Sequence, residues 1–412
     1  MKGIRSQLAS IPFPGRAAAQ NATRWFPRGD GESFSQFLGA SLLSATGSLP
    51  QHLGPLIIIV IVADGRIAVS DAGWILSVRA IGELLASIVL PLLGIAEVGR
   101  TISLAASALF LGALVAAQLA DLTAMLLGFF VLGAAGGVLK FLGTLAASTY
   151  RNRTFAFLFR LASVLGIAGG AICVLFAANA FTSYPALLGR LIVIVVPILM
   201  LGGFLYKPLR QPASGPAHHA QAPSMSGVFG LLILYLFFVA ISGFMAYVGQ
   251  QAAIRGVSVK DTVLSIGTIK ILAAAWLLIA ASFLPRDARK EIVAWEIALL
   301  LAGIWLVSLS SNVLEFFAGL LVLEISLNGC SARLQSAIVG AAPHFAGRWL
   351  NGVILLGTAS GPPLYGLAIG ADKQAVFLAL SSAVVCLPLV WQAWRMQWSR
   401  YELVAASDTK AR

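Results

Sequence analysis

Six ionisable side chains occur inside long apolar stretches of the sequence, where a charge is costly. They are His52, Arg79, Glu83, Lys140, Lys270 and Glu324. An ionisable side chain at the centre of a bilayer costs about 2.5–3.5 kcal/mol on insertion scales, so each one indicates a functional site unless a partner accounts for it. Buried groups of this kind bind charged solutes or carry protons.

Arg79 and Glu83 are four residues apart, so they share one face of a helix and can pair there. Two interpretations remain open for this pair. Either it is a neutral intrahelical ion pair that tolerates burial, or Glu83 is a proton carrier controlled by Arg79 and by the loss of water. His52 can change its charge near neutral pH, but a satisfied buried imidazole explains it equally well.

The composition predicts the elements that position these residues. Of the 412 residues, 59% are hydrophobic and 11% are charged, and the mean hydropathy is +0.90. A soluble domain carries about 25% charged residues, so this composition cannot supply a water-exposed surface. The apolar runs are continuous and long, which favours helices over a β-barrel. The sequence therefore predicts an all-α membrane protein with about twelve transmembrane helices.

The predicted spans alternate with short polar loops. They are 37–62, 72–95, 101–120, 122–147, 160–181, 186–206, 227–252, 262–284, 291–309, 311–331, 348–370 and 374–395. Most of the 28 Lys and Arg residues then fall in the termini and in alternate loops on one side, which the positive-inside rule assigns to the cytoplasm. This asymmetry explains the net charge of +12. We therefore expect a multi-pass protein with the lipid bilayer as partner, no nucleic acid and both termini cytoplasmic; the short loops suit a bacterial inner membrane.

The chain divides into two similar halves around a polar linker rich in Pro, Ala and Ser. Leu76-Ser77-Val78 in the first half matches Leu264-Ser265-Ile266 in the second, and Phe129-Phe130 matches Phe316-Phe317 in the same order. Two six-helix pseudo-repeats are a known transporter device. The predicted divisions are a basic cytoplasmic tail (1–36), an N-terminal half (37–206), a cytoplasmic linker (207–226), a C-terminal half (227–396) and a cytoplasmic tail (397–412).

Local motifs add to this arrangement. The stretches Asp71–Ser77 and Leu132–Gly137, and above all Gly357–Gly366 with its GxxxGPxxxG pattern, resemble the second, fourth and eleventh helices of the major facilitator superfamily. The loop Gly94–Arg100 keeps Gly94, Gly99 and Arg100 of that family's pattern but lacks its Asp-Arg pair. The fifth span, Gly166–Gly170, lacks the Pro of drug–proton antiporters, which weighs against a multidrug exporter.

The resemblance implies a central cavity lined by spans one, four, seven and ten. It makes Lys140 an anchor for a substrate carboxylate or phosphate, and Glu324 its counter-ion or a proton site; a structural Lys140–Glu324 bridge between the halves is the alternative. Lys270 is a second candidate for attracting anions or for an interdomain contact. Neutral substrate contacts are expected from Gln51, His52, Tyr247, Gln250 and Gln251. The expected interdomain or gating residues are Arg100, Lys270, Gly361, Pro362 and Pro363.

These features predict a secondary active transporter. It moves a small organic solute, anionic or zwitterionic, by alternating access, and is coupled to protons through Glu83 or Glu324, with Arg79 as a modulator. One alternative is proton-driven efflux of drugs or of cationic or amphipathic metabolites; another is a membrane sensor or scaffold that kept the carrier fold without transport. The scattered His and Cys residues and the missing GxxxxGK[ST] loop predict no enzyme, no metal and no cofactor. We expect a monomer.

Overall fold

The computed structural model describes residues 34–92, 100–119, 121–149, 183–206, 225–283, 294–341 and 343–410. This part of the chain forms helices joined by turns and contains no strand. The expected N-terminal tail up to residue 33, the span 160–181, most of the loop Gly94–Arg100 and nearly all of the linker lie outside the described residues.

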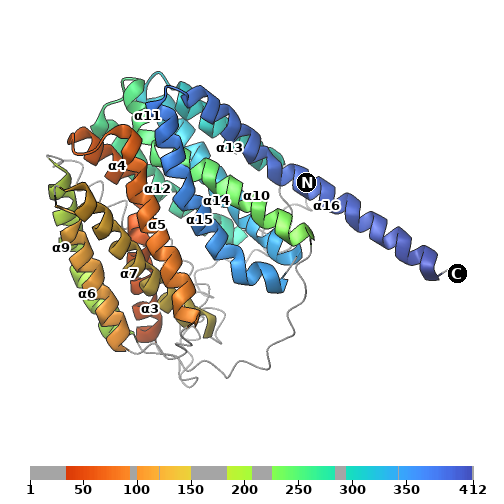
Figure 1. The fold of residues 1–412 in the computed structure, drawn as a ribbon, viewed down its shortest axis with the longest axis horizontal. Helices are drawn as coiled ribbons and strands as arrows, with labels where there is room; N and C mark the ends of the chain where they lie inside the picture. The colour runs from red at the N-terminus through yellow and green to blue at the C-terminus, as the bar shows by residue number, and fades with distance from the viewer. Residues whose placement is uncertain are drawn as a thin grey trace, which may run out of the picture.

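The described helices form two groups along the chain (Figure 1). The N-terminal group contains α3 (Phe34–His52), α4 (Gly54–Ala63), α5 (Val69–Leu92), α6 (Arg100–Ala116), α7 (Leu122–Thr149) and α9 (Tyr184–Leu205). The C-terminal group contains α10 (Met225–Ala246), α11 (Val248–Ile254), α12 (Val259–Phe283), α13 (Ala294–Leu309), α14 (Val313–Ala341), α15 (Pro343–Gly370) and α16 (Gln374–Lys410).

Seven of the described helices are long and apolar enough to cross a membrane, and the count is eight if the bent pair α3 and α4 is one span. The shorter helices α6 and α13 are also apolar. The expected all-helical architecture is confirmed for the described residues, while the number twelve and the two repeats stay predictions. Most boundaries match within a few residues, but α14 continues to Ala341, ten residues past the expected 331, and α16 continues to Lys410, fifteen residues past the expected 395.

Two expected spans are broken in the structure. The span 37–62 is split into α3 and α4, which meet at an angle of 44°. Pro55 explains this break because it has no N–H to donate to the carbonyl of Gln51. The span 227–252 is likewise split into α10 and α11 at Tyr247, whose φ and ψ of −109° and 15° are not helical. The first break directly follows Gln51 and His52 and the second falls at Tyr247, and the sequence predicts all three residues to contact substrate.

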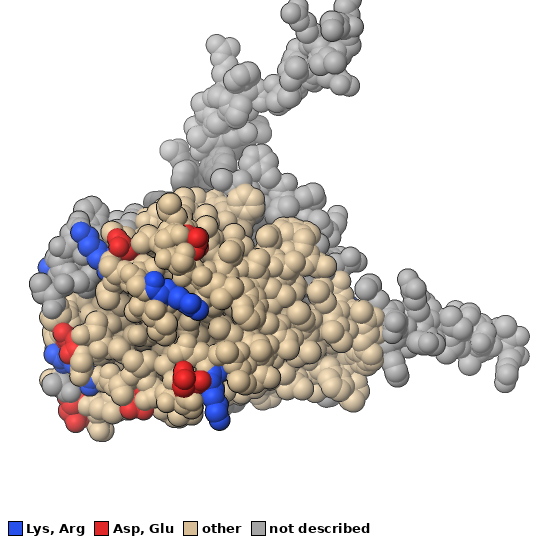
Figure 2. Space-filling view, turned by 90° about the horizontal axis from the view of Figure 1, so that it is seen from above, with Lys and Arg blue, Asp and Glu red and all other residues tan. Residues whose placement is uncertain are grey.

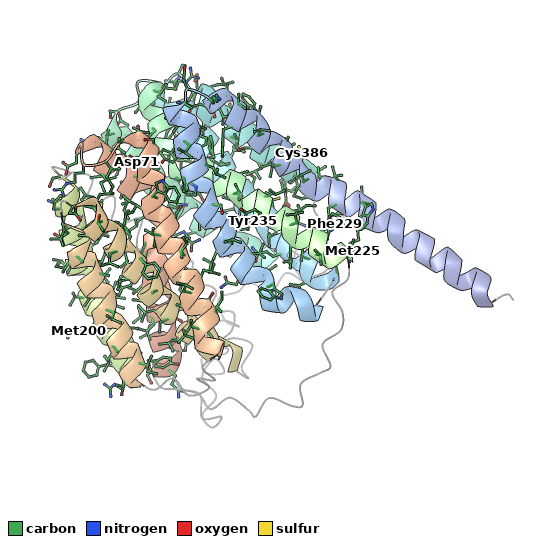
Figure 3. All side chains as sticks on the ribbon, viewed as in Figure 1. Asp71, Met200, Met225, Phe229, Tyr235 and Cys386 are labelled. Atoms are coloured by element: carbon green, nitrogen blue, oxygen red, sulfur yellow. The ribbon has the colours of Figure 1, made fainter. Side chains whose placement is uncertain are left out.

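The outer surface is apolar, as a lipid-facing surface must be. Large hydrophobic side chains stay exposed along the helices; Val193 is 73% exposed and Leu314 80%. Met200 and Met225 lie at the outer edge of the bundle (Figure 3). Viewed from one end, charged side chains cover only part of the face, and a broad area carries none (Figure 2). Exposed apolar area of this extent is unstable in water and fits a bilayer.

The two groups adjoin at the end that carries α4 and α11, which we call the seam end, and their helices diverge toward the opposite end (Figure 1). The contacts between the groups are made chiefly by α4 and α5 on one side and by α10, α11 and α15 on the other. Small residues let α5 and α15 approach closely: a Cβ on Gly73 would lie 2.5 Å from the carbonyl oxygen of Pro362. We call this contact the seam; it comprises Ser70, Gly73 and Ser77 of α5 and Ala359, Pro362, Gly366 and Gly370 of α15.

Candidate functional site

A cavity of about 210 Å³ lies between the two groups. Its wall is built by α3, α4 and α5 from the N-terminal group and by α10, α12, α14 and α15 from the C-terminal group. The polar and charged side chains on this wall include Gln51, His52, Arg79, Lys270, Glu324 and Asn328. The apolar remainder includes Leu76, Phe238, Ile241, Met245 and Leu327.

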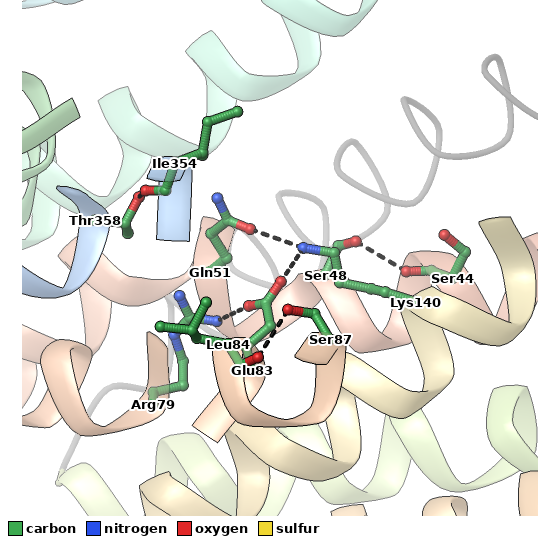
Figure 4. A network of polar contacts seen from close by, with 10 residues as sticks. All are labelled: Ser44, Ser48, Gln51, Arg79, Glu83, Leu84, Ser87, Lys140, Ile354 and Thr358. Atoms are coloured by element: carbon green, nitrogen blue, oxygen red, sulfur yellow. Dashed lines mark hydrogen bonds and ion pairs between the residues drawn. The ribbon is translucent and has the colours of Figure 1, made fainter. Parts of the chain in front are cut away.

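The N-terminal group carries a three-residue ion network (Figure 4). Arg79 donates from Nη1 to Glu83 Oε2 at 2.8 Å, which confirms that these residues pair along one face of α5. Lys140 of α7 donates to the other oxygen of the same carboxylate. Lys140 also donates to Gln51 Oε1 at 3.2 Å, which connects α7 to the end of α3. Glu83 is thus held between two cations from two helices.

The C-terminal group has its own ion pair. Lys270 of α12 donates to Glu324 of α14, and both side chains are largely buried, at 14% and 6% exposed. The alternative interpretation of a structural Lys140–Glu324 bridge between the halves does not match this structure, because each carboxylate pairs within its own group. The error has a simple cause: spacing along the chain shows that Lys140 and Glu324 lie in different spans, but not which cation reaches which acid.

Arg79 differs from the other charged residues of the site. Its side chain is 2% exposed, it lines the cavity, and its buried Nε has no hydrogen-bond partner among the described residues. Buried polar groups nearly always have a hydrogen-bond partner, so this unpaired N–H donor is an exception.

The expected substrate contacts on span seven lie beside the seam. Tyr247 is fully buried, and its hydroxyl accepts a hydrogen bond from the backbone N–H of Gly73 at 2.7 Å. Gln251 donates to the hydroxyl of Tyr365 at 2.5 Å. These two residues, and Gln250, are not among the residues that line the described cavity. Their role in binding substrate stays a prediction, whereas Gln51 and His52 do lie on the cavity wall.

The expected gating residues have different environments. Arg100 begins α6, and its guanidinium lies 4.6 Å from the ring centroid of Phe204. Gly361 packs against α10 of its own group, where an added Cβ would lie 2.7 Å from Gly243 N. Pro362 lines the cavity and contacts Gly73 across the seam, and Pro363 is buried beside it.

Several residues of the site were not predicted from the sequence. Ser77 donates across the seam to the carbonyl oxygen of Ala359, and Asn328 and Thr358 lie on the cavity wall. Gly73 and Ser77 are four residues apart, and such small residues at helical spacing are the signal that could have indicated this contact. Thr358 lies within the Gly357–Gly366 motif, whereas no sequence pattern indicates Asn328. In the described part of the chain, no group of three or more His, Cys, Asp or Glu residues could hold a metal ion.

Comparison with solved structures defines the class of fold. No protein-family model and no curated protein matches the sequence. The structure is similar to that of the human organic anion transporter MFSD10 (TETRAN), with a TM-score of 0.56 and 15% identity over 87% of this chain and 97% of that one. It is similar to a mutant of the nucleoside transporter NupG, with a TM-score of 0.65 and 15% identity over 87% and 99%.

A third match is a bacterial homolog of the human lysosomal transporter Spinster in an inward-facing and occupied conformation. The TM-score is 0.60, with 14% identity over 89% of this chain and 96% of that one. The three proteins are transporters and not enzymes. Because the identities are low, the likeness shows the fold: this chain is an integral, multi-pass membrane protein with the fold of these transporters. The fold that the sequence resemblance implies is confirmed by this likeness.

Proposed function

We propose that this protein is a secondary active transporter that moves a small organic solute across a membrane by alternating access. The observation that supports this best is a cavity walled by both helix groups and closed at one end by the seam. A solute bound there touches both groups, so a rocking motion about it can expose it to either side in turn.

The size and charge of the cavity favour a small anionic or zwitterionic solute. Its volume of about 210 Å³ is below the range of about 300–1,000 Å³ of pockets for drug-sized ligands. Efflux of drugs is therefore the weaker alternative. Arg79 and Lys270 supply cationic groups to the wall, and Glu324 is the acidic side chain on it. Glu324 lines the cavity, whereas Glu83 does not and is bonded to both Arg79 and Lys140. We therefore infer that Glu324 is the stronger candidate for proton coupling.

The distribution of basic residues supports an orientation. The positive-inside rule assigns the loop between α4 and α5 and the loop between α11 and α12 to the outer side. The seam end then faces outward, and the cavity opens toward the cytoplasm between the diverging helix ends. We propose a twelve-span protein of a bacterial inner membrane with both termini in the cytoplasm.

A disulfide across the seam tests the proposal without knowledge of the substrate. A Cβ on Gly370 would lie 3.2 Å from Ser70 Cβ, close to disulfide geometry. In a variant without Cys173, Cys330 and Cys386, S70C with G370C should cross-link. Ser331 lines the cavity, so S331C reports access to membrane-impermeant maleimide. We expect S331C to react from both membrane faces without the cross-link, and from one face only once the cross-link forms.

The matched control is a cross-link inside one group. A Cβ on Gly202 of α9 would lie 3.2 Å from Leu42 Cβ of α3, the same separation as at the seam. L42C with G202C should leave two-sided labelling of S331C unchanged. Labelling from one face in every variant would contradict alternating access and favour the sensor or scaffold alternative.

A further inference from the structure

The ion pair of Lys270 and Glu324 lies on the cavity wall, and both partners can form further hydrogen bonds. Lys270 and Glu324 are 14% and 6% exposed. Lys270 Nζ donates to Glu324 Oε1, and an ammonium group has two more N–H donors. Glu324 Oε2 accepts no hydrogen bond from the described residues, yet it is not one of their fully buried polar atoms without a partner. The pair therefore presents one cationic donor and one anionic acceptor to the cavity.

Charge neutrality restricts what this pair can bind. Lys270 and Glu324 compensate each other, so a ligand with a single charge would bring an uncompensated ion into the buried space beside them. A ligand with both a carboxylate and an ammonium group adds no net charge and can bond to both residues at once. Charge-assisted hydrogen bonds are about twice as strong as neutral ones, which favours a zwitterion over a neutral polyol. Arg79 also lines the cavity, but its guanidinium is bonded to Glu83.

The rest of the cavity wall suits a small ligand with an apolar body. Gln51 lines the cavity from the N-terminal group; its Oε1 accepts from Lys140, and its Nε2 donates to no other residue that the structure describes. This amide is thus an available donor for a ligand carboxylate from the opposite group. The apolar side chains on the wall include Leu76, Phe238, Ile241, Met245 and Leu327. A mainly apolar wall with a few polar groups that fix orientation is typical of small-molecule sites.

We propose that the Lys270–Glu324 pair binds the two charged ends of a small zwitterionic amino acid with an apolar side chain. The inference rests on the proposed transport function and names its substrate class. Lys270 binds the carboxylate, Glu324 binds the ammonium group, and Gln51 adds a contact from the N-terminal group. Glu324 keeps its proposed part in proton coupling, because a bound ammonium group and a proton compete for the same carboxylate.

Ligands with the same body but different charges test the need for a zwitterion. L-leucine is compared with 4-methylpentanoate, which lacks the ammonium group, and with 3-methylbutylamine, which lacks the carboxylate. L-alanine is compared in the same way with propionate and ethylamine, and myo-inositol serves as the neutral polyol. Binding is measured by titration calorimetry on the full-length protein in detergent. We expect leucine or alanine to bind at least about tenfold more tightly than its two analogues and inositol, as the loss of one charge-assisted hydrogen bond implies.

Single substitutions should change the preferred charge of the ligand and not merely weaken binding. Glu324→Gln leaves Lys270 without its carboxylate, so this variant should bind 4-methylpentanoate at least about tenfold more tightly than the unaltered protein does. Lys270→Gln should do the same for 3-methylbutylamine. Lys270→Gln combined with Glu324→Gln leaves no unpaired charge at this position and should abolish binding of both amino acids. The double variant tests the site even if the single variants fold poorly.

Arg333→Gln combined with Glu296→Gln is the matched control. These residues form another ion pair in the same helix group, at 13% and 7% exposed, and neither lines the described cavity. This double variant should leave amino-acid binding unaltered.

Four results would overturn the proposal. A single-charge analogue or inositol binds as tightly as both amino acids, neither amino acid binds, the double variant of Lys270 and Glu324 binds them as the control does, or the folded single variants keep the charge preference of the unaltered protein. Two-sided labelling of S331C together with any of these results overturns the amino-acid site alone and leaves the transport proposal standing.

Discussion

At the scale of single residues, Glu83 decides whether the charges of α5 and α7 are tolerated in the membrane. It accepts from Arg79, which is buried, and from Lys140, which is partly exposed, so its removal takes this carboxylate from both cations. Breaking a buried ion pair from one side costs about 3–5 kcal/mol. We therefore expect Glu83→Gln to lower the melting temperature of the purified protein clearly. Glu315→Gln is the control, because Glu315 is exposed, and an equal fall in both variants would show that Glu83 is not the anchor of the network.

The ionisable residues of the site were predictable from the sequence, and so was the pairing of Arg79 with Glu83 along one helix, but the partners on other helices were not. His52, Arg79, Lys270 and Glu324 were identified from their cost in an apolar span, and all four lie on the cavity wall. The pairing of Lys140 with Glu83 depends on how α5 and α7 pack, and the unpaired Nε of Arg79 depends on a single rotamer. Neither property is carried by residue type or spacing.

At the scale of elements, the contact of α5 with α15 holds the seam closed. A Cβ on Gly73 would lie 2.5 Å from the carbonyl oxygen of Pro362 and 2.8 Å from the hydroxyl of Tyr247. Gly73→Ala should therefore push α15 away and shift the protein toward the state with an open seam. The measurement is the rate of S331C labelling from the seam end, which should rise severalfold.

Gly112 offers the matched control for this change. An added Cβ at Gly112 of α6 meets nothing within 4 Å, so Gly112→Ala should leave the labelling rate unchanged. If Gly73→Ala also leaves it unchanged, the seam is a static packing contact and does not open.

The helices were largely predictable because each described span is a continuous apolar run. The two broken spans were not, although the reason differs between them. Pro55 gives a physical cause for the bend between α3 and α4 and was present in the sequence. The break at Tyr247 has no Pro, and the hydroxyl of that residue bonds across the seam. A tertiary contact of this kind overrides the local helical preference and leaves no local signal.

At the scale of the whole molecule, the proposed function requires two helix groups that move as units. The ion pairs Lys140–Glu83 and Lys270–Glu324 each join two helices of the same group. The described hydrogen bonds across the seam are made by two hydroxyl groups: Tyr247 of the C-terminal group accepts one bond, and Ser77 of the N-terminal group donates the other. The groups can therefore separate at the seam without leaving a buried charge unpaired. Had Lys140 paired with Glu324, as in the alternative interpretation of the sequence, the same motion would have broken an ion pair between the groups.

The most direct test of alternating access is a pair of distances between spin labels, one pair at each end of the molecule. Leu119 and Lys260 are exposed on opposite groups at the seam end, and Thr101 and Met225 are exposed on opposite groups at the other end. Pulsed electron resonance should detect two populations at each end in lipid nanodiscs. With a change of pH, the seam-end distance should lengthen in the same fraction of molecules in which the other distance shortens. A single unchanged distance at both ends under every condition would contradict the account.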